Sequence, residues 1–137
     1  MLAAASVVLD DHGRILLVKH GYGELNWELP GGGAETHESA EETARREARE
    51  EVGVELEIDR LTGVYWEPEK DAHHFVFRAR STGDARVHDR GEITQIGWFD
   101  PTALPRPLSD LTERRIADAI GDTWVHMRTI GPRVWRR

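Results

Sequence analysis

Three acidic side chains, Glu47, Glu50 and Glu51, recur at spacings that would place them together on one helix. At about 100° per residue, positions three and four apart lie over one another on a helix face. Carboxylates held together beside apolar surface repel one another and are poorly solvated, so either their pKa values rise or a cation neutralises them. Oxygen ligands favour a hard ion, and the pattern therefore predicts a site for Mg²⁺ or Mn²⁺.

The helix that must carry these acids is marked at both ends. Ser39 and Glu42 have the spacing of a capping box, and Gly53 is placed where a left-handed residue ends a helix. The sequence therefore predicts a helix over residues 39–52. Alanines at every fourth position, followed by Val52, give this helix an apolar stripe that adjoins the acids.

A different interpretation is that the helix is a solvated, charged surface. Glu41 with Arg45 and Glu42 with Arg46 are favourable pairs four residues apart, as on many exposed helices. Composition alone would favour this interpretation, and only the wider spacing of the motif decides against it.

The spacing around the helix is more specific than its composition. Gly32, five residues, Glu38, seven residues and then Arg46 to Val54 read G-x5-E-x7-REAREEVGV. This pattern closely resembles the signature of the Nudix hydrolases, G-x5-E-x7-R-E-U-x-E-E-x-G-U, in which U is a bulky aliphatic residue. Every fixed identity is present, and the one departure is Ala48 at the first U position, where we expect looser packing of the helix.

The resemblance implies a set of metal ligands and a supporting cation. Glu47, Glu50 and Glu51 would bind Mg²⁺ directly or through water, with Mn²⁺ as the alternative ion. A backbone carbonyl in the glycine loop, at Gly32, would complete the site. Arg46, one turn from Glu50, would orient a glutamate through an ion pair. The same resemblance implies hydrolysis of a phosphoanhydride bond.

The residues that would activate water and hold a nucleotide base are less well defined. The resemblance implies that the general base is either a glutamate of the motif or an acid from a later loop, where Glu92 is the candidate. Tyr65, Trp66 and Phe75 are aromatic side chains able to stack on a base. Aromatic residues in strands more often belong to the core, and that alternative stays open for all three.

Composition limits the other classes of function. The chain has 137 residues, which predicts one domain over residues 1–137. A net charge of −7 argues against a nucleic-acid polymer as partner, although a metal site can still bind the phosphates of a nucleotide. Without cysteine there is no disulfide or thiolate chemistry, which agrees with a reducing, cytoplasmic compartment. No apolar run reaches membrane-spanning length, so we expect no membrane partner.

The remaining pattern predicts strands. Residues 3–9 and 14–20, separated by a turn-rich tetrad, predict a hairpin whose second strand is buried on both faces. Alternating apolar residues predict further strands, the last of them central in its sheet, over residues 27–29, 54–66, 73–79 and 94–99.

Between the strands, Gly31 to Gly33 predict a sharp turn that approaches a ligand closely, and residues 66–72 predict a polar loop. Asp110 and Glu113 are placed to cap a second helix over residues 111–120. Strands with helices on opposite faces predict an α/β/α sandwich with a mixed central sheet, the fold that the Nudix resemblance also implies.

The last stretch of the chain, residues 122–137, mixes tryptophans and aliphatic residues with arginines. Such apolar content seldom stays solvated. We therefore expect this tail to pack on the body of the protein or at the interface of a homodimer.

These observations together predict a Mg²⁺-dependent pyrophosphohydrolase of the Nudix type. Its substrate would be a nucleoside diphosphate joined to another group, such as a (deoxy)nucleoside triphosphate or ADP-ribose. An alternative is a catalytically silent module of the same fold that senses a nucleotide for a partner, but a binding-only domain has no need of clustered, repelling acids. A third alternative is an interaction domain whose tail forms the binding surface.

Overall fold

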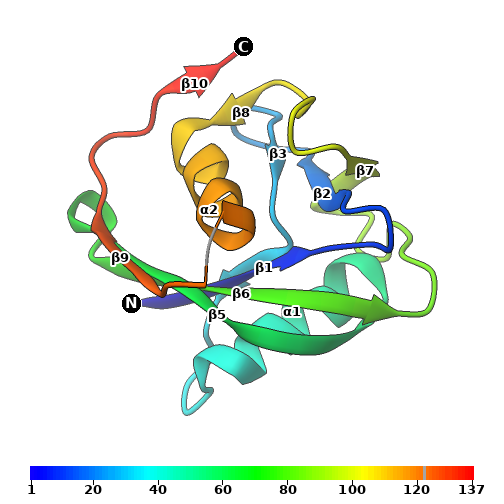
Figure 1. Ribbon diagram of the computed structural model, residues 1–137, viewed down its shortest axis with the longest axis horizontal. Helices are drawn as coiled ribbons and strands as arrows, with labels where there is room; N and C mark the ends of the chain where they lie inside the picture. The colour runs from blue at the N-terminus through cyan, green and yellow to red at the C-terminus, as the bar shows by residue number, and fades with distance from the viewer. Residues whose placement is uncertain (122) are drawn as a thin grey trace.

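Three sheets and two α-helices make up the described part of the fold, and the largest sheet lies between the helices (Figure 1). The structure is a computed structural model that describes residues 1–121 and 123–137. The five strands of the largest sheet are, in chain order, β1 Leu2–Val8, β4 Gly31–Gly33, β5 Glu55–Glu67, β6 Ala72–Thr82 and β9 His126–Thr129. They lie side by side in the order β4-β1-β6-β5-β9. Because β1 with β6 and β5 with β9 are parallel while the other pairs are antiparallel, the sheet is mixed.

The two helices cover opposite faces of this sheet (Figure 1). Helix α1 spans Ala40–Val52 and helix α2 spans Asp110–Gly121. This arrangement confirms the predicted α/β/α sandwich with a mixed sheet. None of the described helices has the length and apolar character that a bilayer span requires.

The ends of α1 follow from the residues that flank it. The Ser39 side chain accepts from the Glu42 amide, and the Glu42 side chain accepts from the Ser39 amide, so the capping box is formed as predicted. Gly53 ends the helix in the left-handed conformation, with a φ of 69°. The alanine stripe is confirmed as well, since Ala44, Ala48 and Val52 are buried.

Helix α2 begins one residue earlier than predicted, and its cap is a different side chain. The Ser109 hydroxyl accepts from the Thr112 amide, whereas Asp110 is the first helical residue and accepts from the Val134 amide of the tail. Glu113 pairs with Arg136 instead of completing a capping box. The expected cap was wrong because both acids bind residues of the tail, and no local sequence pattern indicates those contacts.

The predicted hairpin of the first two strands is not formed. β2, Ile15–His20, is the middle strand of a separate three-stranded sheet, flanked by β3, Trp27–Glu28, and β7, Ile93–Phe99. Among the described residues, β2 pairs with the end of the first strand segment only through a single bridge, from Ile15 to Leu9. β7 is therefore an edge strand and not the central strand that its sequence suggested.

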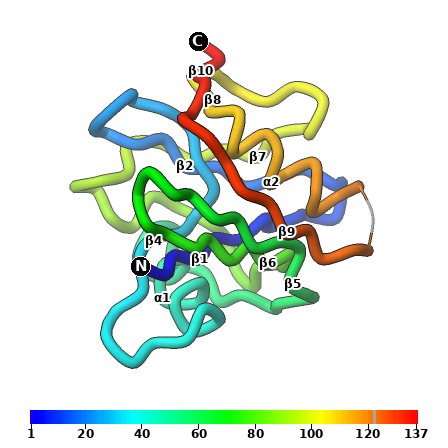
Figure 2. The backbone as a smooth tube through the Cα atoms, turned by 90° about the vertical axis from the view of Figure 1, so that its left-hand side faces the viewer, coloured from blue at the N-terminus to red at the C-terminus, as the bar shows by residue number. Residues whose placement is uncertain are grey.

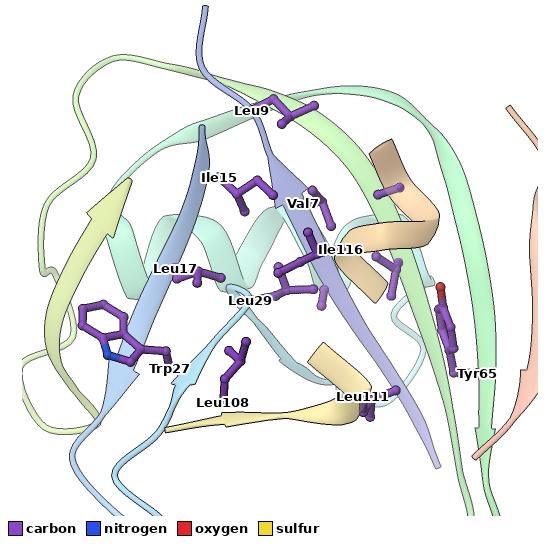
Figure 3. Packing of buried hydrophobic residues seen from close by; sticks show 13 residues of the cluster. Val7, Leu9, Ile15, Leu17, Trp27, Leu29, Tyr65, Leu108, Leu111 and Ile116 are labelled. Carbon is purple, nitrogen blue, oxygen red and sulfur yellow. The ribbon is translucent and has the colours of Figure 1, made fainter. Parts of the chain in front are cut away.

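Burial of β2 on both faces is confirmed, and it explains why this strand separates two halves of the core. Ile15 and Leu17 pack with α2 in one apolar cluster, which Figure 3 shows around Leu29 and Ile116. Leu16 and Val18 pack on the α1 side in the other cluster. The acidic helix is thus fixed to the sheet by an apolar layer of its own.

Two segments predicted as loops are regular structure. Gly31 to Gly33 form β4, antiparallel to β1, and a side chain at Gly31 would collide with the Ala4 backbone. Glycine is needed there for close approach of two strands and not for a turn. β5 continues to Glu67 and is followed by a short 3₁₀ turn, Pro68–Lys70, in place of a polar loop.

The tail returns to the body of the protein. Asp122, with which the expected tail begins, lies outside the described residues. Beyond it, β9 extends the largest sheet beside β5, and β10, Trp135–Arg136, pairs with β8, Leu108–Ser109. Figures 1 and 2 show this segment, in red, running from β9 past α2 to β10.

Candidate active site

Glu51 lies at the centre of the site, on the face of α1 that turns toward β4. Its carboxyl accepts a hydrogen bond of 2.7 Å from the Gly31 amide, and the residue is only 5% exposed. Burial, and then the nearby charges of Glu47, Glu28 and Glu92, raise the pKa of Glu51 to about 9, although the Gly31 amide opposes the rise. A carboxyl in this position strongly favours a neutralising cation or a proton.

Glu47 lies beside Gly32 and is half desolvated by the strand. A methyl group at Gly32 would stand 2.6 Å from Oε1 of Glu47, which shows how closely this side chain approaches the backbone. Burial raises the pKa of Glu47 despite its ion pair with Arg46, and the charge of Glu50 adds to the rise. The structure therefore brings Gly32, Glu47 and Glu51, three of the residues expected at the metal site, close to one another.

Arg46 organises the acids of the motif. Its guanidinium donates to Glu47 at 3.0 Å and to Glu50 at 3.1 Å through Nη1, and to Glu38 at 2.8 Å through Nε. It also donates to the Gly33 carbonyl of β4. The surface pair between Arg46 and Glu42 that the solvated-helix interpretation required is absent from these contacts, because Arg46 points to the acid cluster.

Glu38 acts on the site through Arg46 and not by contact with the other acids. Hydrogen bonds from Arg46 and from the Thr43 hydroxyl lower the pKa of Glu38 to about 2, so it is ionised throughout the physiological range. An ionised acid on the far side of Arg46 keeps the guanidinium in place.

Glu92 is brought to the same cluster by a loop that is tied to the end of α1. The amides of Arg86 and His88 donate to the last-turn carbonyls of Val52 and Glu51, at 3.0 and 2.9 Å. The Asp89 carboxyl then accepts from the Glu92 amide. The charge of Glu92 is near enough to raise the pKa values of Glu47 and Glu51, although its side chain is solvent-exposed.

Three further residues at this site had not been predicted. His20 and Tyr22 stack on each other with ring centroids 4.7 Å apart, and the Gly21 amide between them donates to the Glu92 carbonyl. Glu28 lies in β3, where burial would raise its pKa but Arg115 and its hydrogen bonds hold it below the usual value. The only sequence signal for Glu28 was an acid between two buried apolar residues, Trp27 and Leu29.

The predicted aromatic residues divide between the faces of the sheet. Tyr65 is fully buried on the α2 side, in the cluster of Figure 3, and donates to Asp118 at 2.8 Å. It is therefore not available to stack on a base. Trp66 lies against His73, with ring centroids 4.5 Å apart, and Phe75 packs on the α1-side cluster.

The donor set of the site suits a hard divalent cation. Within residues 1–121 and 123–137, no three carboxylate or imidazole groups are already gathered closely enough to hold a metal ion. Glu51 is engaged by the Gly31 amide, and Glu47 and Glu50 by Arg46. Yet burial and neighbouring acids raise the pKa values of Glu47 and Glu51, which a cation would oppose, and oxygen ligands alone match Mg²⁺ or Mn²⁺.

A hollow of about 860 Å³ lies elsewhere, between α2 and the tail. Of the arginines that line it, Arg128 is paired with Asp118 and Arg136 with Glu113. It contains none of the acids of the motif. Chemistry, and not the size of a hollow, therefore locates the active site.

Comparison with known proteins places this geometry in a family. The profile of the NUDIX domain matches residues 1–120. A "MutT-like protein" of Streptomyces ambofaciens is 31% identical over 128 residues, which are 93% of this chain and 82% of that protein. A "Putative 8-oxo-dGTP diphosphatase" of Bacillus subtilis (strain 168) is 36% identical over 112 residues, which are 82% of this chain and 74% of that protein.

The fold agrees with these sequence matches. The crystal structure of a NUDIX hydrolase from Nitrosomonas europaea superposes with a TM-score of 0.83 over 96% of this chain and 78% of that one, at 21% identity. A match at that identity supports the fold alone. With the profile, the relatives and the fold in agreement, the chain belongs to the NUDIX domain family of pyrophosphohydrolases and is a hydrolase acting on phosphoanhydride bonds.

Proposed function

We propose that this protein is a Mg²⁺-dependent pyrophosphohydrolase that cleaves the diphosphate linkage of a nucleoside diphosphate joined to another group. The observation that carries the proposal is Glu51, a buried carboxyl beside the Gly31 amide whose pKa is raised to about 9. A divalent cation would stabilise the charged form of such a group more than that of any exposed acid.

The proposed ligands are the carboxylates of Glu47, Glu50 and Glu51 and the backbone carbonyl of Gly32, with Mn²⁺ as the alternative ion. When bound, the metal would neutralise phosphate charge and provide an oriented water. Arg46 supports this arrangement because one guanidinium nitrogen donates to both Glu47 and Glu50 and so sets the direction of both carboxylates.

Glu92 is the proposed general base, and a glutamate of the motif is the alternative. Its carboxylate makes no hydrogen bond or ion pair with other residues in the described part of the chain, so it is free to accept a proton. Its charge acts on both Glu47 and Glu51, which supports a place for it beside the proposed metal site. Its exposed side chain can reach a water beside the motif acids, as a base requires.

The proposed substrates are a (deoxy)nucleoside triphosphate, including an oxidised one, and ADP-ribose. The name of the Bacillus subtilis relative supports the first of these. Trp66 and Phe75 remain the proposed aromatic contacts for a base, since both are only partly buried. Tyr65 is withdrawn from this group because its ring lies in the core.

A nucleotide panel with and without Mg²⁺, with products identified by mass, tests the proposal. Metal-dependent release of two phosphorylated products from one member of the panel would support it. Tight nucleotide binding without turnover would instead indicate a silent sensing module, and neither binding nor turnover would indicate an interaction domain.

Two further parts of the proposal concern the state of the protein in the cell. A chain without cysteine suits the reducing cytoplasm, which we propose as its compartment. Val125 and Met127 of the tail are 51% and 83% exposed, and a second copy of the chain is their proposed cover. Sedimentation of the protein across a range of concentrations would detect the dimer, and a monomer at all concentrations would exclude it.

A further inference from the structure

Arg133, in the tail beyond the NUDIX match, reaches into a row of buried charges. Its Nε and Nη2 donate to Glu67 at 3.3 and 3.4 Å, and its Nη1 lies 4.0 Å from Glu28. The side chain of Arg133 is 19% exposed, that of Glu28 is 12% exposed and that of Glu67 is 1% exposed. The guanidinium is thus held between two strands, β3 and β5, that are far apart in the sequence.

Each carboxylate of this row also has a partner in the body of the protein. Glu28 accepts from Arg115 and from the Thr112 hydroxyl, both on α2. Glu67 bonds to His74, whose pKa is lowered by burial, so the ring is neutral at neutral pH. Arg133 is therefore the charge that balances Glu67, while Glu28 is already balanced without it.

The row adjoins the acids of the motif. Glu28 stands three residues before Gly31, the amide of which binds Glu51. His20, at the end of β2, is close enough to Glu28, Glu92 and Arg133 for all three charges to act on its ring. We take a substrate whose diphosphate lies at the motif acids to extend its attached group along this row toward Arg133.

Two guanidinium nitrogens of this row donate no hydrogen bond within the described residues. Nη1 of Arg133 is bonded to nothing in the described residues, since its distance from Glu28 is too long for a hydrogen bond. Arg115 donates to Glu28 through its Nη2, whereas its Nε is buried and has no partner among the described atoms. An oxygen atom of a ligand would satisfy a donor that the protein leaves open.

We propose that Arg133 is a specificity-determining residue of the active site, and that its Nη1 donates to an oxygen of the group that the substrate carries beyond its diphosphate. Glu67 holds the guanidinium by two bonds, so the third nitrogen keeps a fixed direction. A carbonyl oxygen of a base and a hydroxyl of a sugar share this chemistry. The inference rests on the proposed function and adds to it that the tail forms one wall of the site.

Steady-state kinetics on Arg133→Gln, Arg133→Lys and Arg136→Gln would test this role. Arg136 is the matched control, because it also ties the tail to α2, through Glu113 at 2.9 Å, but lies away from Glu28. We expect Arg133→Gln to raise KM by about ten- to a hundredfold with little change in kcat, as for the loss of a charged hydrogen bond. Arg133→Lys should be intermediate, and Arg136→Gln should match the unaltered protein.

The substrate panel identifies the oxygen that Arg133 contacts. A loss confined to bases with a carbonyl, such as guanine against adenine, would assign the contact to the base. An equal loss for all bases would assign it to the sugar. Equal effects of Arg133→Gln and Arg136→Gln, or a fall in kcat at constant KM, would show that Arg133 only anchors the tail and would overturn the inference.

Binding of an uncleavable nucleotide separates this inference from the proposed function. A nucleotide with a methylene group in place of the bridging oxygen is titrated into each variant, whether or not the protein has turnover. Weaker binding to Arg133→Gln but not to Arg136→Gln would support the inference, and equal binding would overturn it. If Arg133→Gln melts below the assay temperature, Arg133→Lys, which keeps a charge beside Glu67, gives the same comparison.

Discussion

Glu51 and Gly31 are joined by a 2.7 Å hydrogen bond from the Gly31 amide to Oε1 of the carboxyl, although they lie 20 residues apart in the chain. This bond ties the last turn of α1 to β4 at the point where the acids converge. It also holds a group whose pKa is raised to about 9 in a buried position. Several measurable properties follow from this relationship and from the contacts around it.

The raised pKa of Glu51 predicts how stability depends on pH without divalent metal. In the unfolded chain the pKa of this acid is about 4.3, whereas in the folded protein it is about 9. The stabilisation is therefore complete below the unfolded pKa and is lost as pH rises toward the folded value, by at most about 1.4 kcal/mol per unit. The melting temperature, measured in the presence of a chelator, should therefore decrease as the pH is raised from about 6 to about 8.5.

The controls for this pH dependence are a variant and a metal. Glu51→Gln, which cannot ionise, should flatten the profile and melt higher than the unaltered protein at about pH 8.5. Added Mg²⁺ should reverse the loss, because it stabilises the charged carboxylate. An unaltered slope in Glu51→Gln would show that another group titrates.

Glu50→Gln should reduce metal-dependent turnover by several orders of magnitude while leaving the melting temperature nearly unchanged. Glu50 is more than half exposed, so the fold does not depend on its charge, whereas the proposed metal site does. Glu41→Gln is the matched control, since Glu41 is an exposed acid of the same helix that pairs with Arg45. Full activity in Glu50→Gln would remove this residue from the proposed mechanism.

The three glycines of β4 should respond differently to alanine. At Gly31 the new methyl would collide with the Ala4 backbone, which cannot move, so Gly31→Ala should destabilise the protein by about 1–3 kcal/mol or more. At Gly32 it would meet the end of the Glu47 side chain, which can swing aside, so Gly32→Ala should stay folded but bind Mg²⁺ more weakly. At Gly33 there is open space, and Gly33→Ala is the control.

Denaturant titration and Mg²⁺ titration of the three variants check these expectations. The decisive comparison is the ratio of stability loss to metal-affinity loss. If Gly32→Ala loses stability and affinity in the same proportion as Gly31→Ala, the contact with Glu47 has no separate role.

Tyr65→Phe should cost about 1 kcal/mol in unfolding free energy and leave the kinetic constants unchanged. The hydroxyl donates to Asp118, a buried acid that Arg128 also holds, so the lost bond is partly compensated. Denaturant unfolding and steady-state kinetics check the two halves of this expectation. A rise in KM would instead return Tyr65 to the substrate site.

Local signals made α1 predictable, and long-range contacts made much of the rest unpredictable. Ser39, Glu42 and Gly53 define the helix through bonds that span only a few residues, so the sequence determined both its ends and the direction of its acids. The pairing partner of β2 is instead β7, which lies more than 70 residues further along the chain. Nothing within the first hairpin-like segment indicates that choice.

The aromatic residues and the tail illustrate two further limits. The pairing of β5 with β6 shifts register between Ile58 and Arg60 and again between Leu61 and Gly63. A period of two therefore cannot be followed along β5, and the burial of Tyr65 could not be inferred from it. Arg133 meets Glu67 across 66 residues, and its flanking sequence gives no sign of that contact.

The bonds from Arg86 and His88 to the last turn of α1 limit where the chain can change length. Extra residues at Gly83, which has a positive φ and open space around it, would leave the register of the following segment intact. An insertion between His88 and Glu92 would instead carry Glu92 away from the helix that presents Glu47 and Glu51. Insertions and deletions in natural or engineered variants should accordingly collect near Gly83 and be absent between His88 and Glu92.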